Sequence, residues 1–547
     1  MGAFVREQRE RHGTPGVSLA VVSADRVVYA CGFGVTSADP AQSVAVTPET
    51  LFRVGSTTKA MTGTLLMRLV EAEKLSLDEP VVTYLPWLTL SDNDATARVT
   101  LRHLMSHQSG LPWGAGFFGD RDPSGLETYV RTQVPLMPLI APPGVLFSYS
   151  NIGVNVSGCV AEAVGGAPFA ELMYTWVFEP LGMERTLFDP LRAMAFPLAQ
   201  AHARTEAGVR VQREEPWAEN VAYRPSAMAY STVLDTARFA RLHLNQGKWD
   251  GQQLLSAESV AEMQKTQVDE YQTDGRTVGL NFALSYYRGH RRVGHGGGIA
   301  SFGSVFTMLP DAGVAVAIQF NENGFWQATE EIVRQVFDAV LQHSSPACAV
   351  PTVPLPPEPK VRDRERCAGT FLGPRSGLVV LSVNDDENSI RLSRRGTGGD
   401  VPLLPLRRDL YAGRNLLTGE EEVVGCIGLT ERHGAEPITH IMLNGAPCVR
   451  VEPDPAFAAD PHAWHAYIGE FRGADETYPS GFDRLTLRCE NDILRVFSLN
   501  RAREEEAIPW EEGCFVYRGR FLRFPKDDPA PMSFTLGDPV VRYERLG

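Results

Sequence analysis

The sequence lacks any uninterrupted apolar run of the roughly 18–20 residues that a membrane-spanning helix needs, so we expect no membrane span. Lysine is scarce, with six lysines among the 52 basic residues. The eight cysteines contain no C-x-x-C pair, which favours free buried thiols over a disulfide framework or a zinc site. The first sixteen residues are charged and lack the apolar segment of a signal peptide, so we expect a cytoplasmic protein.

The charge balance is acidic, with a formal net charge of −14 at pH 7, which disfavours nucleic acid and anionic membranes as partners. With 43% apolar and 22% charged residues, the composition is that of a globular protein and excludes disordered, collagen-like and coiled-coil classes. A single core seldom grows past about 250–300 residues, so a chain of 547 residues predicts two or three domains.

Proline marks the main domain boundary. Six of the residues from 346 to 359 are proline, and the charged run Lys360–Arg366 follows them. Proline fixes φ and removes an N–H donor, so residues 346–366 predict an extended linker. This linker separates a first domain, residues 1–345, from the C-terminal part of the chain.

The first domain combines predicted strands at its two ends with helices between them. The strands expected from alternating or continuous apolar patterns are Val17–Val22, Val27–Ala30, Gly303–Leu309 and Gly313–Phe320. Helical periodicity marks Ala60–Leu75, Val154–Val164, Leu172–Phe178 and Ala328–Gln342. This order predicts an α+β domain whose sheet joins N-terminal and C-terminal strands.

The C-terminal part contains a weak internal repeat. Gly369-Thr-Phe371 and Gly469-Glu-Phe471 each precede alternating apolar residues, one hundred residues apart. We expect two small closed β-barrel (lipocalin-like) domains, residues 367–452 and 466–547. In the second, the polar segment Gly473–Gly481 is either a solvated loop or a loop that reaches the catalytic cleft and limits substrate size.

Three short motifs could carry chemistry. In Ser56-Thr-Thr-Lys59, residues three apart share one helical face, so the hydroxyl and the amine meet at a helix N-terminus, where a developing anion is favoured. A serine becomes nucleophilic when a nearby base accepts its proton, and burial lowers the pKa of a lysine enough for this role. The alternative is an N-capping serine beside a solvated lysine.

The second motif is Tyr149-Ser-Asn151, in which a phenol can relay protons and an amide can orient a lysine or a substrate carbonyl. The third is Gly294–Gly298, in which four glycines around His295 allow close backbone approach to a ligand and an N–H for an oxyanion. The alternatives are a capping asparagine beside a packed tyrosine, and a mobile glycine-rich turn.

Two other readings of the histidines carry less weight. The H-G-G-G segment at residue 295 is similar to the oxyanion motif of α/β-hydrolase lipases, but the G-x-S-x-G elbow that those enzymes need is missing from the sequence. His103 and His107 lie four apart on a predicted helix without a third metal ligand, so we expect a packed structural pair and no metal site.

The order S-x-x-K, Y-x-N, H-x-G, at separations of 93 and 146 residues, resembles the serine β-lactamase and penicillin-binding protein superfamily. The likeness extends to the surrounding segments Leu51–Lys59, Val99–Pro112 and Phe178–Met183, and covers roughly residues 5–342. The resemblance implies a helical cluster packed against a mixed α/β sheet, with the active site between them.

The resemblance also assigns roles. It makes Ser56 the acylated nucleophile, Lys59 its proton-accepting partner and Tyr149 the general base that also protonates the leaving group. Asn151, His295 and Gly297 would orient the substrate, and the backbone N–H groups of Ser56 and Gly298 would form the oxyanion hole. No metal or organic cofactor is implied.

One departure from the family pattern affects the substrate. Most β-lactamases and DD-peptidases have lysine-threonine-glycine where this chain has His295-Gly296-Gly297, and the missing lysine and hydroxyl normally help to hold a substrate carboxylate. A histidine there is similar to the D-aminopeptidase and esterase branches, and D-aminopeptidases also carry two C-terminal β-barrels. The resemblance thus implies a serine hydrolase acting on short D-configured peptides or amides.

Several alternatives stay open at this point. Within catalysis they are a carboxylesterase, a β-lactamase and a peptide-cyclising acyltransferase. Outside catalysis, a penicillin-recognising sensor would acylate and barely deacylate. The expected partner is a small-molecule or short-peptide substrate, and a homodimer is possible.

Overall fold

The computed structural model describes the chain outside residues 115–120, 206–207, 212–218, 345–360, 374–375, 385–388, 395–399, 408, 416–418, 428–436, 453, 455, 457–459, 474–483, 491–492, 499–502, 513, 518–519, 525–532, 537–540 and 546–547. Within the described residues, the helices are too short or too polar to cross a bilayer.

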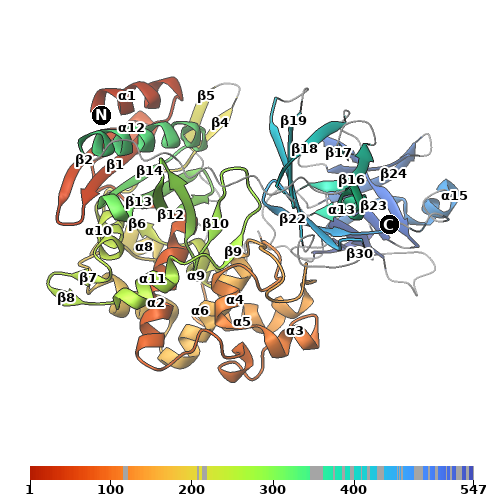
Figure 1. Cartoon of the computed structure of the whole chain (residues 1–547), viewed down its shortest axis with the longest axis horizontal. Helices are drawn as coiled ribbons and strands as arrows, with labels where there is room; N and C mark the ends of the chain where they lie inside the picture. Colours follow the sequence, from red (N-terminus) through yellow and green to blue (C-terminus); the bar gives the residue numbers. More distant parts are fainter. Residues whose placement is uncertain are drawn as a thin grey trace.

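An eight-stranded antiparallel sheet organises the first domain (Figure 1). In sheet order its strands are β2 (Val27–Gly34), β1 (Gly16–Ser23), β14 (Val314–Phe320), β13 (Phe302–Leu309), β12 (His290–Ile299), β11 (Ala283–Tyr287), β10 (Thr277–Val278) and β9 (Val268–Asp269). Strand β1 pairs with β14 in the register Val17 to Phe320. The prediction that the sheet joins the two ends of the domain is therefore confirmed.

Both faces of this sheet are covered. Alternate side chains of a strand point to opposite faces, so each central strand contributes to two cores. Val17, Leu19 and Val21 of β1 pack under helices α1 (Gly2–Arg11) and α12 (Trp326–Ser344), which lie together on one face (Figure 1). Ala20 and Val22 join the larger core on the other face. Helix α10 (Val233–Leu244) contacts β1 and β14.

A helical lobe completes the first domain. At its centre is α2 (Thr58–Glu71), which is buried over most of its length and contacts α6 (Asn151–Gly165) and α9 (Arg224–Ala227). The remaining α-helices are α3 (Asn93–Arg98), α4 (Leu101–Met105), α5 (Gly125–Thr132), α7 (Phe169–Met173), α8 (Pro190–Ala193) and α11 (Ala257–Met263). The short strand pairs are β3 (Phe52–Arg53) with β6 (Tyr230–Ser231), β4 (His202–Thr205) with β5 (Gly208–Val211), and β7 (Lys248–Trp249) with β8 (Gln252–Gln253).

The first C-terminal domain is a closed antiparallel barrel, as predicted. Its strands are β15 (Gly369–Gly373), β16 (Gly377–Asn384), β17 (Ser389–Arg394), β18 (Val401–Arg407), β19 (Leu410–Arg414), β20 (Glu421–Cys426), β21 (His440–Leu443) and β22 (Ala446–Arg450). Buried apolar side chains fill its interior. The charged run that we assigned to the linker instead forms helix α13 (Val361–Cys367), because Arg364 and Arg366 are buried there rather than solvated.

The second C-terminal domain is a nine-stranded antiparallel sheet, preceded by α15 (Pro461–Trp464). In sheet order its strands are β26 (Arg503–Glu506), β25 (Ile493–Ser498), β24 (Arg484–Glu490), β23 (Gly469–Gly473), β31 (Val541–Arg545), β30 (Ser533–Leu536), β29 (Arg520–Arg523), β28 (Cys514–Tyr517) and β27 (Ile508–Glu511). Only Ala507 separates the two edge strands, β26 and β27, so the two edges of the sheet come together at this residue. The segment Gly473–Gly481, which we considered as a loop reaching the cleft, lies outside the described residues except for Gly473.

The first barrel contacts the first domain beside the β9–β10 hairpin. Met442 of β21 shares a buried apolar cluster with Phe147 and Val278. Thr273 in the hairpin donates a hydrogen bond to Glu421 (2.9 Å), and the His440 imidazole is 3.0 Å from the carbonyl oxygen of Ile140.

Candidate active site

Ser56 lies in a single turn, η2 (Gly55–Thr57), that leads directly into helix α2. Gly55 has a φ of +50°, and a Cβ there would come within 2.8 Å of the backbone nitrogen of Gly298. The turn that carries Ser56 therefore packs against strand β12, a contact that only a glycine permits. This brings the first and third motifs together.

Lys59 is fully buried beside Ser56. Its Nζ is 3.0 Å from Ser56 Oγ, 2.6 Å from Asn151 Oδ1 and 2.8 Å from the carbonyl oxygen of Ser226. Burial holds the pKa of the Lys59 ammonium well below its ordinary value. The environment of Lys59 therefore favours the neutral amine.

The hydrogen-bond partners of Lys59 determine where the lone pair of its neutral amine points. A neutral amine has two N–H donors and one lone pair. The oxygens of Asn151 and Ser226 can only accept, so they take the two donors. The third neighbour, the Ser56 hydroxyl, then faces the lone pair. In this state the arrangement can accept the proton of Ser56 as the oxygen attacks a carbonyl.

The second motif lies at the start of helix α6. The Asn151 amide donates to the carbonyl of Gly114 (3.0 Å), which turns its Oδ1 toward Lys59. Ser150 caps the helix by accepting from the N–H of Gly153 (2.9 Å). Tyr149, just before this cap, places its ring 4.9 Å from the Lys59 Nζ, measured to the ring centroid.

The third motif runs along β12. A Cβ at Gly297 would be 1.9 Å from the carbonyl oxygen of Val54 and 2.7 Å from the N–H nitrogen of Thr57. Ser304 of the neighbouring strand donates to the same Val54 carbonyl (2.6 Å) and contacts the Thr57 hydroxyl (2.7 Å). Strand β12 is thus held tightly against the turn that carries Ser56.

His295 is half-buried, and its ring centroid is 6.4 Å from that of Tyr149. Burial and the nearby Lys59 lower its pKa to about 4, so the imidazole is neutral at pH 7. Its Nδ1 is 2.6 Å from the carbonyl oxygen of Gly296, which can only accept a hydrogen bond. The proton therefore sits on Nδ1, and Nε2 is left as an acceptor.

Comparison with known proteins identifies the family. The sequence matches the β-lactamase family over residues 1–340, more than half of the chain. The chain belongs to the β-lactamase family. It is 29% identical over 371 residues to penicillin-binding protein 4 of Amycolatopsis lactamdurans, covering 66% of this chain and 94% of that protein. It is 25% identical over 463 residues to the unguisins hydrolase ungD' of Aspergillus campestris, covering 77% of this chain and 84% of the hydrolase.

Structural comparison agrees on the fold. The crystal structure of SurE superposes with a TM-score of 0.64 and 23% sequence identity, over 82% of this chain and 98% of that one. The expected β-lactamase-like catalytic fold is confirmed, and the protein is a serine hydrolase of the β-lactamase and penicillin-binding protein family.

Sequence reasoning missed several groups in this β-lactamase-family site. The carbonyl groups of Ser226 and Gly114 are backbone atoms, for which no side-chain pattern exists. Ser304 lies inside an apolar strand and gave no signal of its own.

The expectation that His103 and His107 share a helix face is wrong. Helix α4 ends at Met105, and His107 follows it with a φ of +58°. His103 instead accepts the N–H of Thr100 in a capping box at the start of the helix. The ring of His107 lies against Tyr149, with centroids 4.5 Å apart.

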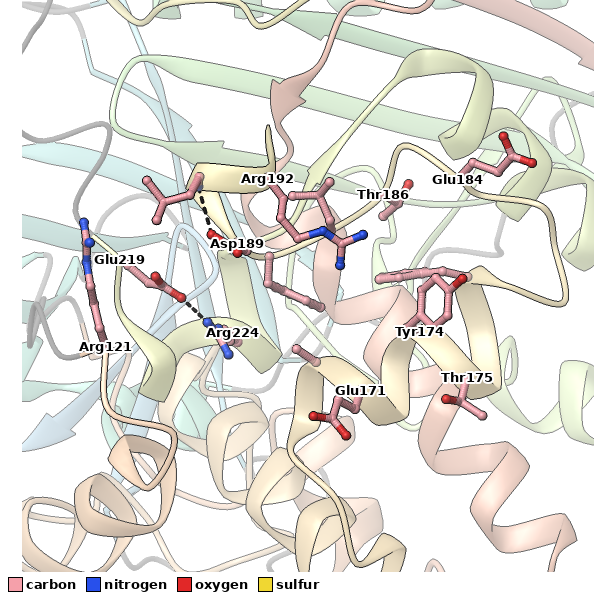
Figure 2. Close-up of a pocket in the computed structure, with 15 residues that line it drawn as sticks. Arg121, Glu171, Tyr174, Thr175, Glu184, Thr186, Asp189, Arg192, Glu219 and Arg224 are labelled. Atoms are coloured by element: carbon pink, nitrogen blue, oxygen red, sulfur yellow. Dashed lines mark hydrogen bonds and ion pairs between the residues drawn. The ribbon is translucent and has the colours of Figure 1, made fainter. Parts of the chain in front are cut away.

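A separate cavity of about 690 Å3 opens on the helical lobe (Figure 2). Tyr174, Asp189 and Arg192 line it, and Glu219 forms an ion pair with Arg224 at one side. Among the described residues that line it, none belongs to the three motifs. Helix α9, which supplies Arg224 to this cavity and the Ser226 carbonyl to Lys59, lies between the two places.

The packing at Gly297 gives a direct test of the site. Gly297→Ala forces β12 away from the Ser56 turn, and the expected result is a fall in kcat of about a hundredfold to a thousandfold, the loss typical of a displaced oxyanion donor. Gly296→Ala is the matched control, because its Cβ would make ordinary van der Waals contacts, with Trp326 at 3.6 Å and the Ser304 carbonyl oxygen at 3.8 Å. Steady-state kinetics and circular dichroism of both variants check this; equal kcat values would contradict it.

Proposed function

We propose that this protein hydrolyses amide or ester bonds of short substrates with D-configured residues, in the manner of a D-aminopeptidase, through an acyl-enzyme on Ser56. The support for the nucleophile is the contact of Ser56 Oγ with a buried lysine amine whose other two neighbours can only accept hydrogen bonds.

The proposed reaction follows from this contact. Ser56 Oγ attacks the substrate carbonyl while its proton passes to the Lys59 amine. The oxyanion accepts hydrogen bonds from the backbone N–H groups of Ser56 and Gly298. Tyr149 protonates the leaving amine or alcohol, and the Lys59 ammonium, close to the phenol ring, returns a proton to Tyr149. Water then attacks the acyl-enzyme by the reverse sequence and releases Ser56.

The neutral His295 supports the proposed substrate class. A lysine at this position would offer a cation to a substrate carboxylate. Here the imidazole offers an acceptor nitrogen, which suits a substrate that presents a donor, such as the free ammonium of an aminoacyl amide or ester. The resemblance to D-aminopeptidases in the third motif and in the two C-terminal β-domains adds the D-configuration.

A substrate panel tests this proposal. We expect kcat/KM for D-aminoacyl p-nitroanilides to exceed that for the L-forms and for nitrocefin by about tenfold or more, the effect of one misplaced hydrogen-bonding group. His295→Lys should shift the preference toward carboxylate-bearing nitrocefin. A higher kcat/KM for simple p-nitrophenyl esters than for the D-aminoacyl p-nitroanilides would favour the esterase alternative. Highest kcat/KM on nitrocefin by the unmodified protein, or on L-forms, would refute the proposed substrate class.

A further inference from the structure

The segment that carries Tyr149 is held on both sides of the tyrosine by one residue, His107. The carbonyl oxygen of His107 accepts the N–H of Ser148 (2.7 Å), and its Nδ1 accepts the N–H of Ser150 (3.2 Å). Between these two bonds the imidazole lies over the Tyr149 ring, with centroids 4.5 Å apart and planes inclined by 32°. His107 thus contacts Ser148, Tyr149 and Ser150.

The backbone of His107 adopts a conformation that favours glycine. Helix α4 ends in a Schellman motif, in which the N–H of Gln108 bonds to the carbonyl of His103 (2.8 Å) and the N–H of His107 to that of Leu104 (3.4 Å). The residue in the left-handed conformation of this motif is usually glycine, and here it is His107, with a φ of +58°. A residue with a Cβ in the left-handed conformation costs free energy, so the His107 side chain must make contacts that glycine cannot make.

The imidazole of His107 is almost completely buried, and its charge state suits this place. Burial, together with Lys59 and His295, holds its pKa well below the ordinary value. With Nδ1 accepting from Ser150, the single ring proton sits on Nε2. A neutral ring can lie beside Lys59 and Tyr149 without adding a cation to the site.

The contacts continue outward to the first barrel. Phe147 meets the His107 ring edge to face, with centroids 6.0 Å apart and planes at 85°. Phe147 is itself buried in one apolar cluster with Met442 of the barrel strand β21, and Tyr149 packs at the edge of that cluster. The tyrosine segment is therefore enclosed between His107 and the barrel.

We propose that His107 is a positioning residue that fixes the phenol of Tyr149 for proton transfer, and that the first barrel supports the same segment through Met442. This inference rests on the proposed role of Tyr149. It gives the barrel a function in catalysis that does not require the barrel to touch the substrate.

Substitutions at His107 separate positioning from helix termination. His107→Gly retains the left-handed conformation but loses the ring and the Nδ1 acceptor. His107→Asn tolerates the same φ, and its amide oxygen can still accept from Ser150. We expect kcat to fall by about a hundredfold in the glycine variant and by about tenfold in the asparagine variant, with KM nearly unchanged, because a misplaced catalytic group slows the chemical step. If His107 only ended helix α4, glycine would be fully active.

A double-substitution cycle shows whether the effect passes through the phenol. In a Tyr149→Phe background, His107→Gly is expected to cause no further loss of kcat. Losses that multiply, or a fully active His107→Gly with an impaired Tyr149→Phe, would overturn the inference and leave the proposed function standing. A fully active Tyr149→Phe would overturn the proposed role of Tyr149 and this inference with it. Thermal unfolding of each variant shows that the fold is retained.

Substitutions that change the size of the Met442 side chain test the contact between the barrel and the Tyr149 segment. Met442→Ala leaves space beside Phe147 and is expected to lower kcat about tenfold, whereas Met442→Leu conserves volume and should retain it. The control is Met194→Ala, which removes an exposed methionine from the helical lobe. An alanine variant at Met442 that unfolds at the normal temperature and keeps the full kcat would refute the role of the barrel.

Discussion

Replacing Ser56 with alanine is expected to lower kcat by about ten-thousand-fold or more on every substrate the protein turns over. The variant keeps the Lys59 amine, the Tyr149 phenol and the backbone donors, but it has no oxygen that can form the acyl-enzyme. Ser56 Oγ lies 3.0 Å from the Lys59 Nζ, and alanine removes this oxygen without replacing it.

The measurement combines initial rates with intact mass after treatment with a fluorophosphonate. The unmodified protein should gain one adduct mass, and Ser56→Ala should gain none. Ser91→Ala, at an exposed serine of the same domain, is the control and should behave as the unmodified protein. Adduct formation on the Ser56→Ala protein would refute the nucleophile. A penicillin adduct on the unmodified protein that does not turn over would instead favour the sensor alternative.

The elements that position the site could be predicted from the sequence where one local pattern determines them. The expected strands at Val17–Val22 and Gly313–Phe320 pair in the structure, because apolar residues at both faces of a strand require burial on both sides. The helix expected over Ala60–Leu75 is present as α2, which runs from Thr58 to Glu71. The repeat in the C-terminal part predicted two closed barrels; the first is a closed barrel, and the second is a nine-stranded antiparallel sheet.

Other features depend on contacts between distant segments and have no local pattern. The expected helix Leu172–Phe178 is interrupted, because its second half forms a π-helical turn, Tyr174–Phe178. The two carbonyl groups that orient Lys59 and Asn151 come from distant parts of the chain: Ser226 is 167 residues from Lys59, and Gly114 is 37 residues from Asn151. Only the folded chain brings such groups together. The sequence did not predict that His107 contacts Tyr149. Helix α4 ends before His107, whose left-handed backbone directs its side chain away from the expected helix face.

Replacing Lys59 with methionine is expected to lower kcat by about a thousandfold or more, because the Ser56 proton then has no amine to accept it. Methionine has a similar length and suits a fully buried position. In the unmodified protein, turnover should rise with pH as the buried ammonium loses its proton, since only the neutral amine can act. Rates measured from acidic to neutral pH check this. A Lys59→Met protein with normal kcat would refute the proposed base.

Lys59→Met is also expected to change how the free energy of unfolding depends on pH. Burial lowers the pKa of Lys59 in the folded protein, whereas in the unfolded chain it returns to about 10.4. Between these two values the unfolded state binds more protons, so the contribution of Lys59 to the free energy of unfolding increases with pH and is least favourable below the folded pKa. Lys59→Met removes this dependence.

The stability difference between Lys59→Met and the unmodified protein should therefore move in favour of the variant as pH falls from about 10 to about 7. Urea denaturation across this range measures the difference. Lys74→Met, an exposed lysine just beyond helix α2, is the matched control and should leave it nearly constant. A difference that stays flat, or that moves against the variant, would mean that Lys59 remains charged in the fold. A charged Lys59 has no lone pair for Ser56, so the catalytic proposal would fail on the same result.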